Sequence, residues 1–135
     1  MKISSKGRYA LRLMTDLAQC APEKWVSLKE ISTRQEISMK YLEQIVTRLC
    51  RAKLLVSMRG PQGGYRFAKP VEDYTVGEIL RAVEGELAPV PCLEGEPGGC
   101  ERRDCCESLR FWKGLSRCVN EYVDSVTLAQ LLTSC

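Results

Sequence analysis

Residues 27–68 read SLKEISTRQEISMKYLEQIVTRLCRAKLLVSMRGPQGGYRFA, and this stretch decides the fold. Ser27 and Glu30 have the spacing of a capping box, which predicts a helix over residues 28–35. Ser38 is placed to cap a second helix, because apolar residues recur after it every three or four positions. The stripe that this helix is expected to bury consists of Tyr41, Leu42, Ile45, Val46 and Leu49. Two short helices joined by a brief connector are typical of a helix-turn-helix.

A β-hairpin is predicted directly after the helix-turn-helix. Residues 54–59 and 65–68 are rich in branched and aromatic side chains and have the length of short strands. The residues between them, 60–64, read GPQGG, and their glycines can adopt the positive φ angles of a tight turn. A hairpin in this position is a wing. The predicted fold class is therefore mainly α with a small β-hairpin, a winged helix-turn-helix.

Helices are also predicted on both sides of this unit. Residues 5–19 place small and apolar side chains on one face of an amphipathic helix, for which Ser5 is the expected N-cap. Thr75 and Glu78 form a second capping box. From Glu107 onward apolar residues recur at spacings of three and four, which predicts one long helix whose stripe a small domain cannot cover by itself. The residues of this stripe are Trp112, Leu115, Val119, Tyr122, Val126 and Ala129.

Charge is distributed unevenly along the 135 residues. Residues 1–69 carry 14 Lys or Arg against 5 Asp or Glu, whereas residues 70–135 carry 6 against 12. A local basic field raises the encounter rate with phosphates, so the front half indicates a polyanionic partner, here double-stranded DNA. On charge alone, a solvated basic surface is the alternative.

Nothing in the sequence indicates export or membrane insertion. The first residues, MKISSKGRYALRLM, lack the apolar run of a signal peptide, and no stretch approaches membrane-spanning length. The chain is therefore expected to be cytoplasmic, with no membrane partner. In a reducing compartment, its eight cysteines favour a metal or cofactor site over disulfides.

The helix that follows Ser38 is expected to present polar side chains to the major groove. Glu43 can accept a hydrogen bond from cytosine, Gln44 can pair with adenine, and Lys40 can contact a phosphate or a guanine. The narrow wing tip, Arg59–Pro61, can enter a minor groove. An ordinary polar helix face and a plain tight hairpin are the alternatives. The residues expected to contact DNA are Lys6, Arg8, Tyr9, Ser38, Lys40, Tyr41, Glu43, Gln44, Arg59, Gly60 and Pro61.

Four of the cysteines lie within residues 92–106, in a stretch rich in Pro, Gly and charge that predicts a loop. A loop lets Cys92, Cys100 and Cys106 converge on one cofactor, and thiolates are the natural ligands of iron-sulfur clusters and zinc. The absence of a C-x-x-C knuckle favours an iron-sulfur cluster. The fourth ligand stays open among Cys105, Asp104, Glu107 and a donor from the first helix of a partner subunit.

The chain is thus expected to divide into three parts: a winged helix-turn-helix DNA-binding domain over residues 1–87, a cysteine-rich cluster-binding loop over 88–106, and a dimerisation helix and tail over 107–135. Another possibility is a cluster-free thiol switch, in which oxidation of Cys105 and Cys106 alters DNA binding. A small thiol redox enzyme is disfavoured, because the chain has no C-x-x-C, no His and no phosphate-binding Gly loop. We expect no enzymatic activity and no small-molecule substrate.

The order of these parts resembles the IscR/NsrR/CymR (Rrf) family of bacterial repressors over almost the whole chain. The most specific segments are SKGRYA at residues 5–10, residues 38–44, residues 59–65 and Cys100-x5-Cys106. The resemblance implies a homodimer that is joined by the long helix and binds palindromic promoter DNA.

The resemblance also implies a two-iron or four-iron cluster held by Cys92, Cys100 and Cys106, with base reading by Glu43 and minor-groove contact by Arg59 and Pro61. One branch of the family has a histidine ligand three residues after the last cysteine, where this chain has Leu109. The cluster type therefore stays open. The signal also stays open among iron-sulfur status, nitric oxide, oxidants and iron.

Overall fold

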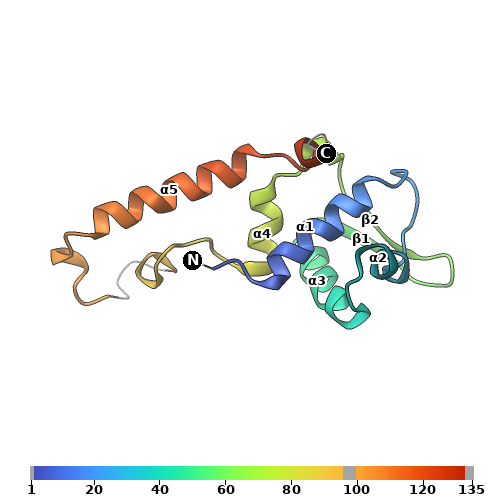
Figure 1. Cartoon of the computed structure of the whole chain (residues 1–135), viewed down its shortest axis with the longest axis horizontal. Helices are drawn as coiled ribbons and strands as arrows, with labels where there is room; N and C mark the ends of the chain where they lie inside the picture. Colours follow the sequence, from blue (N-terminus) through green and yellow to red (C-terminus); the bar gives the residue numbers. More distant parts are fainter. Residues whose placement is uncertain (1, 96–99, 133–135) are drawn as a thin grey trace.

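Helices and one two-stranded hairpin make up residues 2–95 and 100–132, the part of the chain described by the computed structural model. In chain order the elements are α1 (Ser5–Ala18), α2 (Leu28–Gln35), α3 (Met39–Arg51), β1 (Leu55–Met58), β2 (Gly64–Phe67), η1 (Val71–Asp73), α4 (Val76–Glu84), η2 (Pro91–Leu93), η3 (Arg103–Cys105), α5 (Leu109–Ser125) and α6 (Leu128–Leu132), the η elements being short 3-10 helices. The predicted fold class is confirmed. Figure 1 shows α1–α4 and the hairpin gathered at one end, with α5 extending from them as an arm.

The predicted capping residues start the helices of the helix-turn-helix. Ser27 and Glu30 make both hydrogen bonds of a capping box at α2, whose bounds are the predicted ones. Ser38 accepts a hydrogen bond from the backbone N–H of Tyr41 and caps α3. Between the two helices, Glu36 adopts the left-handed conformation with φ 55° and turns the chain. The capping box of Thr75 and Glu78 likewise starts α4.

The start of α1 differs from the prediction, because Ser4 and not Ser5 is the N-cap. Ser4 has an extended backbone, and its hydroxyl accepts a hydrogen bond from the Lys6 N–H at 3.1 Å. Ser5 is already helical, and its hydroxyl accepts from the Arg8 side chain. Glu84 of α4 accepts from the Ser4 backbone N–H and hydroxyl, and this contact between distant parts of the chain favours Ser4 as the cap.

The C-terminal region also differs, because the predicted single long helix is broken. α5 ends at Ser125, and Val126 is extended, with φ −99° and ψ 121°. The Val126 carbonyl accepts a hydrogen bond from the Val76 N–H at 2.9 Å, which anchors this segment to the start of α4. Thr127 and Gln130 then exchange capping hydrogen bonds at the start of α6. Tertiary pairing and a local cap therefore override the apolar spacing.

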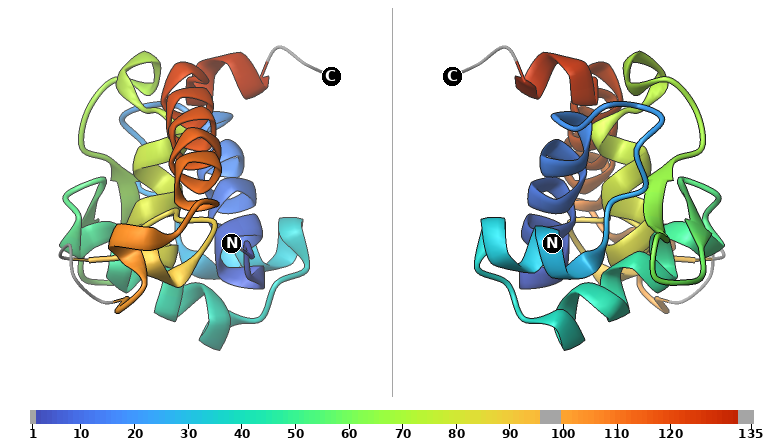
Figure 2. Two further views of the ribbon diagram at one scale, coloured as in Figure 1. Left: turned by 90° about the vertical axis from the view of Figure 1, so that its left-hand side faces the viewer. Right: turned by 90° about the vertical axis from the view of Figure 1, so that its right-hand side faces the viewer.

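The main core lies between α1, α2, α3 and α4. Its fully buried members include Leu13, Met14, Ile31, Leu42, Ile45, Leu49, Tyr74 and Ile79. A second, smaller cluster of Val76, Leu80 and Leu87 receives Val119 and Val123 from α5. Figure 2 views the chain end-on, along the direction in which α5 projects from the winged domain. The arm is thus attached to the winged domain through α4.

The hairpin is antiparallel, and its register pairs Leu55 with Phe67 and Met58 with Gly64. β1 is one residue shorter at each end than predicted, and β2 has the predicted length but begins one residue earlier. A third segment joins them, because Val26 and Tyr65 exchange backbone hydrogen bonds of 2.8 and 3.0 Å. This bridge fixes the wing against the start of α2, and local sequence patterns gave no sign of it.

Candidate DNA interface and cysteine loop

The first turn of α3 carries the side chains predicted to read bases. Lys40, Glu43 and Gln44 are all exposed. Within the described part of the chain, none of these three side chains makes a hydrogen bond or an ion pair. Tyr41 is half-buried and packs against the main core. The arrangement leaves polar groups of α3 available to an external partner, while its apolar stripe anchors the helix.

The first turns of α1 lie next to this helix. The ring of Tyr9 meets the ring of Tyr41 edge-on, with centroids 5.3 Å apart. The guanidinium groups of Arg8 and Arg12 lie over the Tyr9 ring, at 5.8 and 5.3 Å from its centroid. Arg12 also donates to Gln35 at the end of α2. This aromatic pair therefore brings the cations of α1 to the helix-turn-helix.

The wing tip has the shape that the sequence predicts. Gly60 has φ 109°, a conformation that favours glycine, and its carbonyl accepts a hydrogen bond from the Gly63 N–H at 3.0 Å. Arg59, Gly60 and Pro61 are exposed. The Arg59 side chain makes no hydrogen bond or ion pair with any residue described. By contrast, Arg66 at the base of the wing stacks over the ring of Trp25 at 4.1 Å.

Residues 91–95 and 100–106, which include the loop cysteines, lie along the arm on the side of the molecule away from the wing (Figure 1). Cys92 is in η2, Cys100 precedes η3, Cys105 ends η3 and Cys106 follows it. Cys105 is exposed and the other three are half-buried. Across residues 2–95 and 100–132, no three Cys, Asp or Glu side chains are grouped so as to hold a metal ion. The expected convergence of the thiolates is therefore not formed in this chain alone.

The chemistry of these donors nevertheless fits a thiolate-ligated group. The Arg103 side chain donates to the Cys92 carbonyl at 3.3 Å and so links the two ends of the loop. Cys106 Sγ lies 3.3 Å from Ser108 Oγ. This hydrogen bond, with smaller contributions from backbone N–H groups and Arg102, lowers the pKa of the Cys106 thiol. A lowered pKa favours the thiolate, which is the form that binds metal.

The cysteines outside the loop are dispersed over the fold. Cys20 and Cys50 are half-buried, and burial raises the pKa of Cys50. Cys118 is exposed on α5. Cys135 lies outside the described residues.

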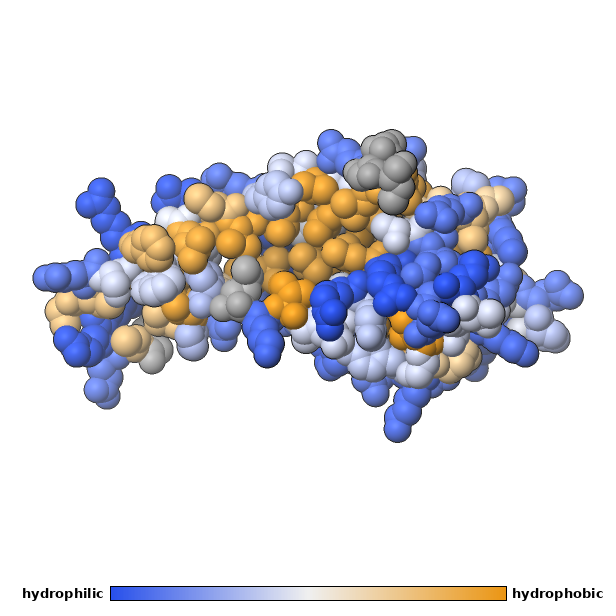
Figure 3. Space-filling model, in the orientation of Figure 1, coloured by the Kyte–Doolittle hydropathy of each residue, from blue (hydrophilic) through white to orange (hydrophobic). Residues whose placement is uncertain are grey.

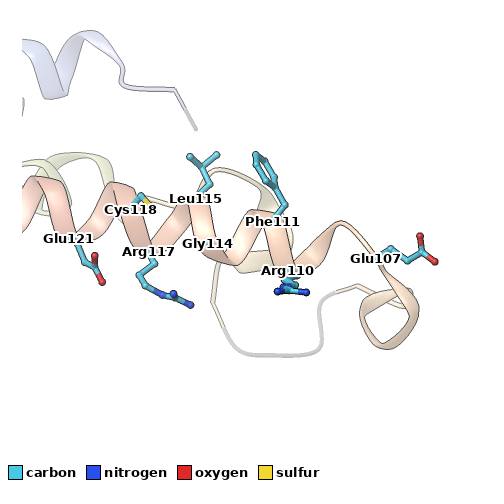
Figure 4. Close-up of a pocket in the computed structure, with 8 residues that line it drawn as sticks. All are labelled: Glu107, Arg110, Phe111, Gly114, Leu115, Arg117, Cys118 and Glu121. Atoms are coloured by element: carbon cyan, nitrogen blue, oxygen red, sulfur yellow. The ribbon is translucent and has the colours of Figure 1, made fainter.

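The arm has one apolar face that none of the residues described by the structure covers. No residue of α5 is fully buried, and Phe111, Leu115 and Tyr122 are 62%, 37% and 70% exposed. Figure 4 shows Phe111 and Leu115 projecting from one side of the helix, and Arg110 and Arg117 from the other. In Figure 3 the hydrophobic colour runs along the arm and onto the adjoining core, whereas the region over the helix-turn-helix is mainly hydrophilic.

Some residues of this arrangement escape local sequence reasoning. Val26 pairs with the second strand of the wing, and Glu84 caps α1. Asp16 joins α1 to α2 through its hydrogen bonds with Arg34. Each acts through a contact that is distant in sequence. A buried acidic residue on an apolar helix face, such as Asp16, is the one signal that a pattern search can find.

A helix-turn-helix with an unpartnered polar face on its second helix, a wing and a basic front half defines a DNA-binding protein of the winged-helix class. The profile of the Rrf2 family, described as "Iron-dependent Transcriptional regulator", matches residues 3–134, and the chain belongs to this family. Within residues 2–95 and 100–132, no helix combines the length and apolar character needed to span a bilayer.

Relatives and solved structures agree with this assignment. The HTH-type transcriptional regulator IscR of Serratia proteamaculans is 38% identical over 134 residues, which cover 99% of this chain and 80% of the relative. The structure of CymR, the global cysteine regulator of B. subtilis, matches with a TM-score of 0.79 and 38% identity, covering 100% of this chain and 98% of that one. IscR of T. potens matches with a TM-score of 0.75 and 38% identity, covering 98% and 86%. The chain is accordingly a DNA-binding transcription regulator and not an enzyme.

Proposed function

We propose that the chain is a homodimeric repressor that binds palindromic promoter DNA, and that an iron-sulfur cluster held by Cys92, Cys100 and Cys106 controls its affinity. One observation carries the proposal. The four loop cysteines directly precede the helix whose apolar face is uncovered, so a cofactor on the loop would act on the helix that joins two subunits. In a dimer, the spacing of the two recognition helices must match the spacing of the DNA half-sites. The affinity for DNA is therefore sensitive to how α5 joins the subunits.

The surface proposed for DNA combines three elements of the winged domain. The first turn of α3 would enter the major groove, and the wing tip would reach the adjacent minor groove. The first turn of α1 would contact phosphates, because its cations lie beside α3 through the Tyr9–Tyr41 pair. The proposed contact residues are Lys6, Arg8, Tyr9, Ser38, Lys40, Tyr41, Glu43, Gln44, Arg59, Gly60 and Pro61.

The apolar face of α5 supports the proposed homodimer. Phe111 and Leu115 are exposed, lie on either side of Gly114 in the sequence and project from one side of the helix. Gly114 costs a helix interior about 1 kcal/mol relative to alanine. No atom of the described residues lies within 4 Å of the position that a Cβ atom at Gly114 would take. A second copy of α5 can approach closely at this glycine and bury the aromatic and aliphatic side chains around it.

The cluster, when bound, would supply a group whose presence and oxidation state depend on iron and oxidants. Cys92, Cys100 and Cys106 would hold it, and Arg103 would keep Cys92 near the turn that contains the other thiols. Cys105, Asp104, Glu107 and a donor from the partner's first helix remain the proposed choices for the fourth ligand.

Anaerobic reconstitution of the full chain with iron and sulfide tests the cluster. We expect visible absorbance with equal amounts of iron and sulfide, and its loss in C92A, C100A and C106A. The matched control is C118A, which removes an exposed thiol outside the loop and should keep the absorbance. A colourless wild-type chain that takes up no iron would contradict the proposal. The absorbance of C105A tests whether this residue is the fourth ligand.

A cluster-free thiol switch is the second candidate. The lowered pKa of Cys106, which its hydrogen bond with Ser108 favours, and the exposed neighbouring Cys105 support it, as does the likeness to the cysteine regulator CymR. An iron-free chain whose DNA affinity changes with oxidant, and no longer does so in C106A, would favour this candidate over the cluster.

A further inference from the structure

Glu84, the last residue of α4, places one carboxylate oxygen against the N-terminus of α1. This oxygen, Oε1, accepts hydrogen bonds from the Ser4 N–H at 3.0 Å, the Ser4 hydroxyl at 2.5 Å and the Gly7 N–H at 2.8 Å. Gly7 is the third residue of α1, and its N–H has no acceptor within the helix. Glu84 therefore satisfies backbone groups that α1 cannot satisfy by itself.

The contact reproduces a capping box with a residue from another helix. In α2 and α4 the acidic member of the box is local, three residues after the cap, as in the pairs Ser27 with Glu30 and Thr75 with Glu78. In α1 that position is Gly7, which has no side chain to return to the cap. The Glu84 carboxylate takes this role across more than 75 residues of sequence.

Gly7 is required by the same contact. A Cβ atom at this position would lie 2.8 Å from Glu84 Oε1 and 2.7 Å from a methyl group of Ile3. Neither distance is compatible with the observed packing, so glycine allows the carboxylate to reach the helix backbone. Glycine has a low helix propensity, and the contact with Glu84 explains why it stands at residue 7 of the sequence.

The turn that Glu84 caps carries proposed DNA contacts. Lys6 and Arg8 flank Gly7, and Tyr9 packs edge-on against Tyr41 of α3. The orientation of this turn therefore sets both the phosphate contacts of α1 and one side of the recognition helix.

The other side of Glu84 leads to the cysteines. Gly85 follows with φ 85° and ends α4. From there the chain continues through Leu87, which packs in the smaller cluster, to Cys92 in η2. Glu84 is thus the point where the root of the cysteine loop and the first turn of α1 are joined by hydrogen bonds.

We propose that Glu84 is a positioning residue for the DNA interface, which fixes the first turn of α1 and ties it to the root of the cysteine loop. The inference rests on the proposed DNA contacts of α1. It predicts that removing the Glu84 carboxylate weakens DNA binding, whereas electrostatic repulsion alone predicts stronger binding. Loss of a negative charge near DNA strengthens binding by reducing repulsion. Loss of the Glu84 cap weakens it, because Lys6 and Arg8 are no longer held in place.

The test compares E84A with E23A. E84A removes the acceptor at the N-terminus of α1, whereas E23A removes an exposed carboxylate elsewhere in the winged domain. The probes are a duplex that the wild-type chain selects from genomic fragments, fluorescence anisotropy at several salt concentrations, and amide hydrogen exchange at Gly7. For E84A we expect about tenfold weaker binding and faster exchange at Gly7. We also expect the slope of log affinity against log salt concentration to fall by about the contribution of one phosphate contact. E23A should bind as tightly as wild type or more tightly.

G7A provides a second variant that keeps the carboxylate but displaces it, and it should weaken binding in the same direction. Unchanged or tighter binding by both E84A and G7A, with faster exchange at Gly7, would show that the contact is only structural and would overturn the inference. A wild-type chain that selects no duplex would instead contradict the proposed function, so the two failures are distinguishable.

Discussion

Arg34 of α2 donates hydrogen bonds to both carboxylate oxygens of Asp16 on α1, at distances from 2.7 to 3.1 Å. Gln35 adds a third donor at 2.9 Å. Asp16 is 5% exposed and is the one buried charged residue in the described part of the chain. The pair joins the first helix to the helix-turn-helix and so fixes the frame on which the recognition helix is presented.

The D16N variant should lose about 2 kcal/mol of unfolding free energy at neutral pH, because charge-assisted hydrogen bonds become neutral ones. Burial raises the pKa of Asp16, but the hydrogen bonds from Arg34 and Gln35 outweigh it and leave the pKa below its ordinary value. The stabilisation by the Asp16 carboxylate is therefore complete above the pH at which carboxyl groups of the unfolded chain titrate. It is lost as the pH falls through the lower pKa that Asp16 has in the folded chain. Urea unfolding at fixed protein concentration should show the gap between wild type and D16N closing in acid.

The matched control is D124N. Asp124 also accepts two hydrogen bonds from an arginine, Arg81, but its side chain is 48% exposed. Exposed pairs contribute less, so D124N should cost under about 1 kcal/mol. Equal losses for the two variants would contradict the importance given to burial of Asp16.

The Tyr9–Tyr41 pair should show coupling in a double-mutant cycle. Y9L, Y41L and the double variant remove the edge-on contact between α1 and α3. Aromatic pairs contribute about 0.5 to 1.5 kcal/mol beyond their buried area. The summed losses of unfolding free energy in the two single variants should therefore exceed the loss in the double variant by that amount. Additive losses in urea unfolding would show that the rings do not couple the helices.

The helix caps of the winged domain could be predicted from sequence because their partners are local. Ser27 with Glu30 and Thr75 with Glu78 lie three residues apart, and each pair sets the start of a helix in the structure. Ser5 was the wrong choice for α1, because the deciding acceptor, Glu84, comes from another helix. Patterns of local spacing carry no information on such contacts.

The broken C-terminal helix has the same explanation. The apolar spacing continues through Val126, but its backbone pairs with Val76, and Thr127 starts a new cap with Gln130. In the candidate site, the exposure of the polar side chains of α3 and the tight turn of the wing could be predicted from sequence. The sequence could not show how the loop cysteines lie, because Pro-rich and Gly-rich segments have no periodicity to interpret.

Arg59 and Arg66 should separate DNA contact from stability. Arg59 at the wing tip is exposed and makes no polar contact within the described residues, so R59A should weaken DNA binding with a change of less than about 0.5 kcal/mol in unfolding free energy. Arg66 stacks on Trp25, so R66A should lose about 0.5 to 1 kcal/mol of stability. Anisotropy and urea unfolding measured on both variants check this. A destabilised R59A that binds DNA normally would contradict the assignment of the wing tip.

The uncovered face of α5 should determine the oligomeric state. F111E places a charge on this face and should yield monomers in light scattering after size-exclusion chromatography, because an unpaired charge would be buried between subunits. R110E is the control, since Arg110 projects from the opposite side of the helix (Figure 4). A dimeric F111E, or a wild-type monomer at micromolar concentration, would contradict dimerisation through α5.

The proposed function requires one dependence: the state of the cysteine loop controls how the basic front half binds DNA. Its most direct test is the dissociation constant for a duplex selected from genomic fragments, measured anaerobically at one salt concentration. The same protein preparation is measured after reconstitution with iron and sulfide and again after chelation. The account predicts affinities that differ by about tenfold or more, and the difference should disappear in C92A. Equal affinities for the reconstituted and chelated wild-type chain would contradict it.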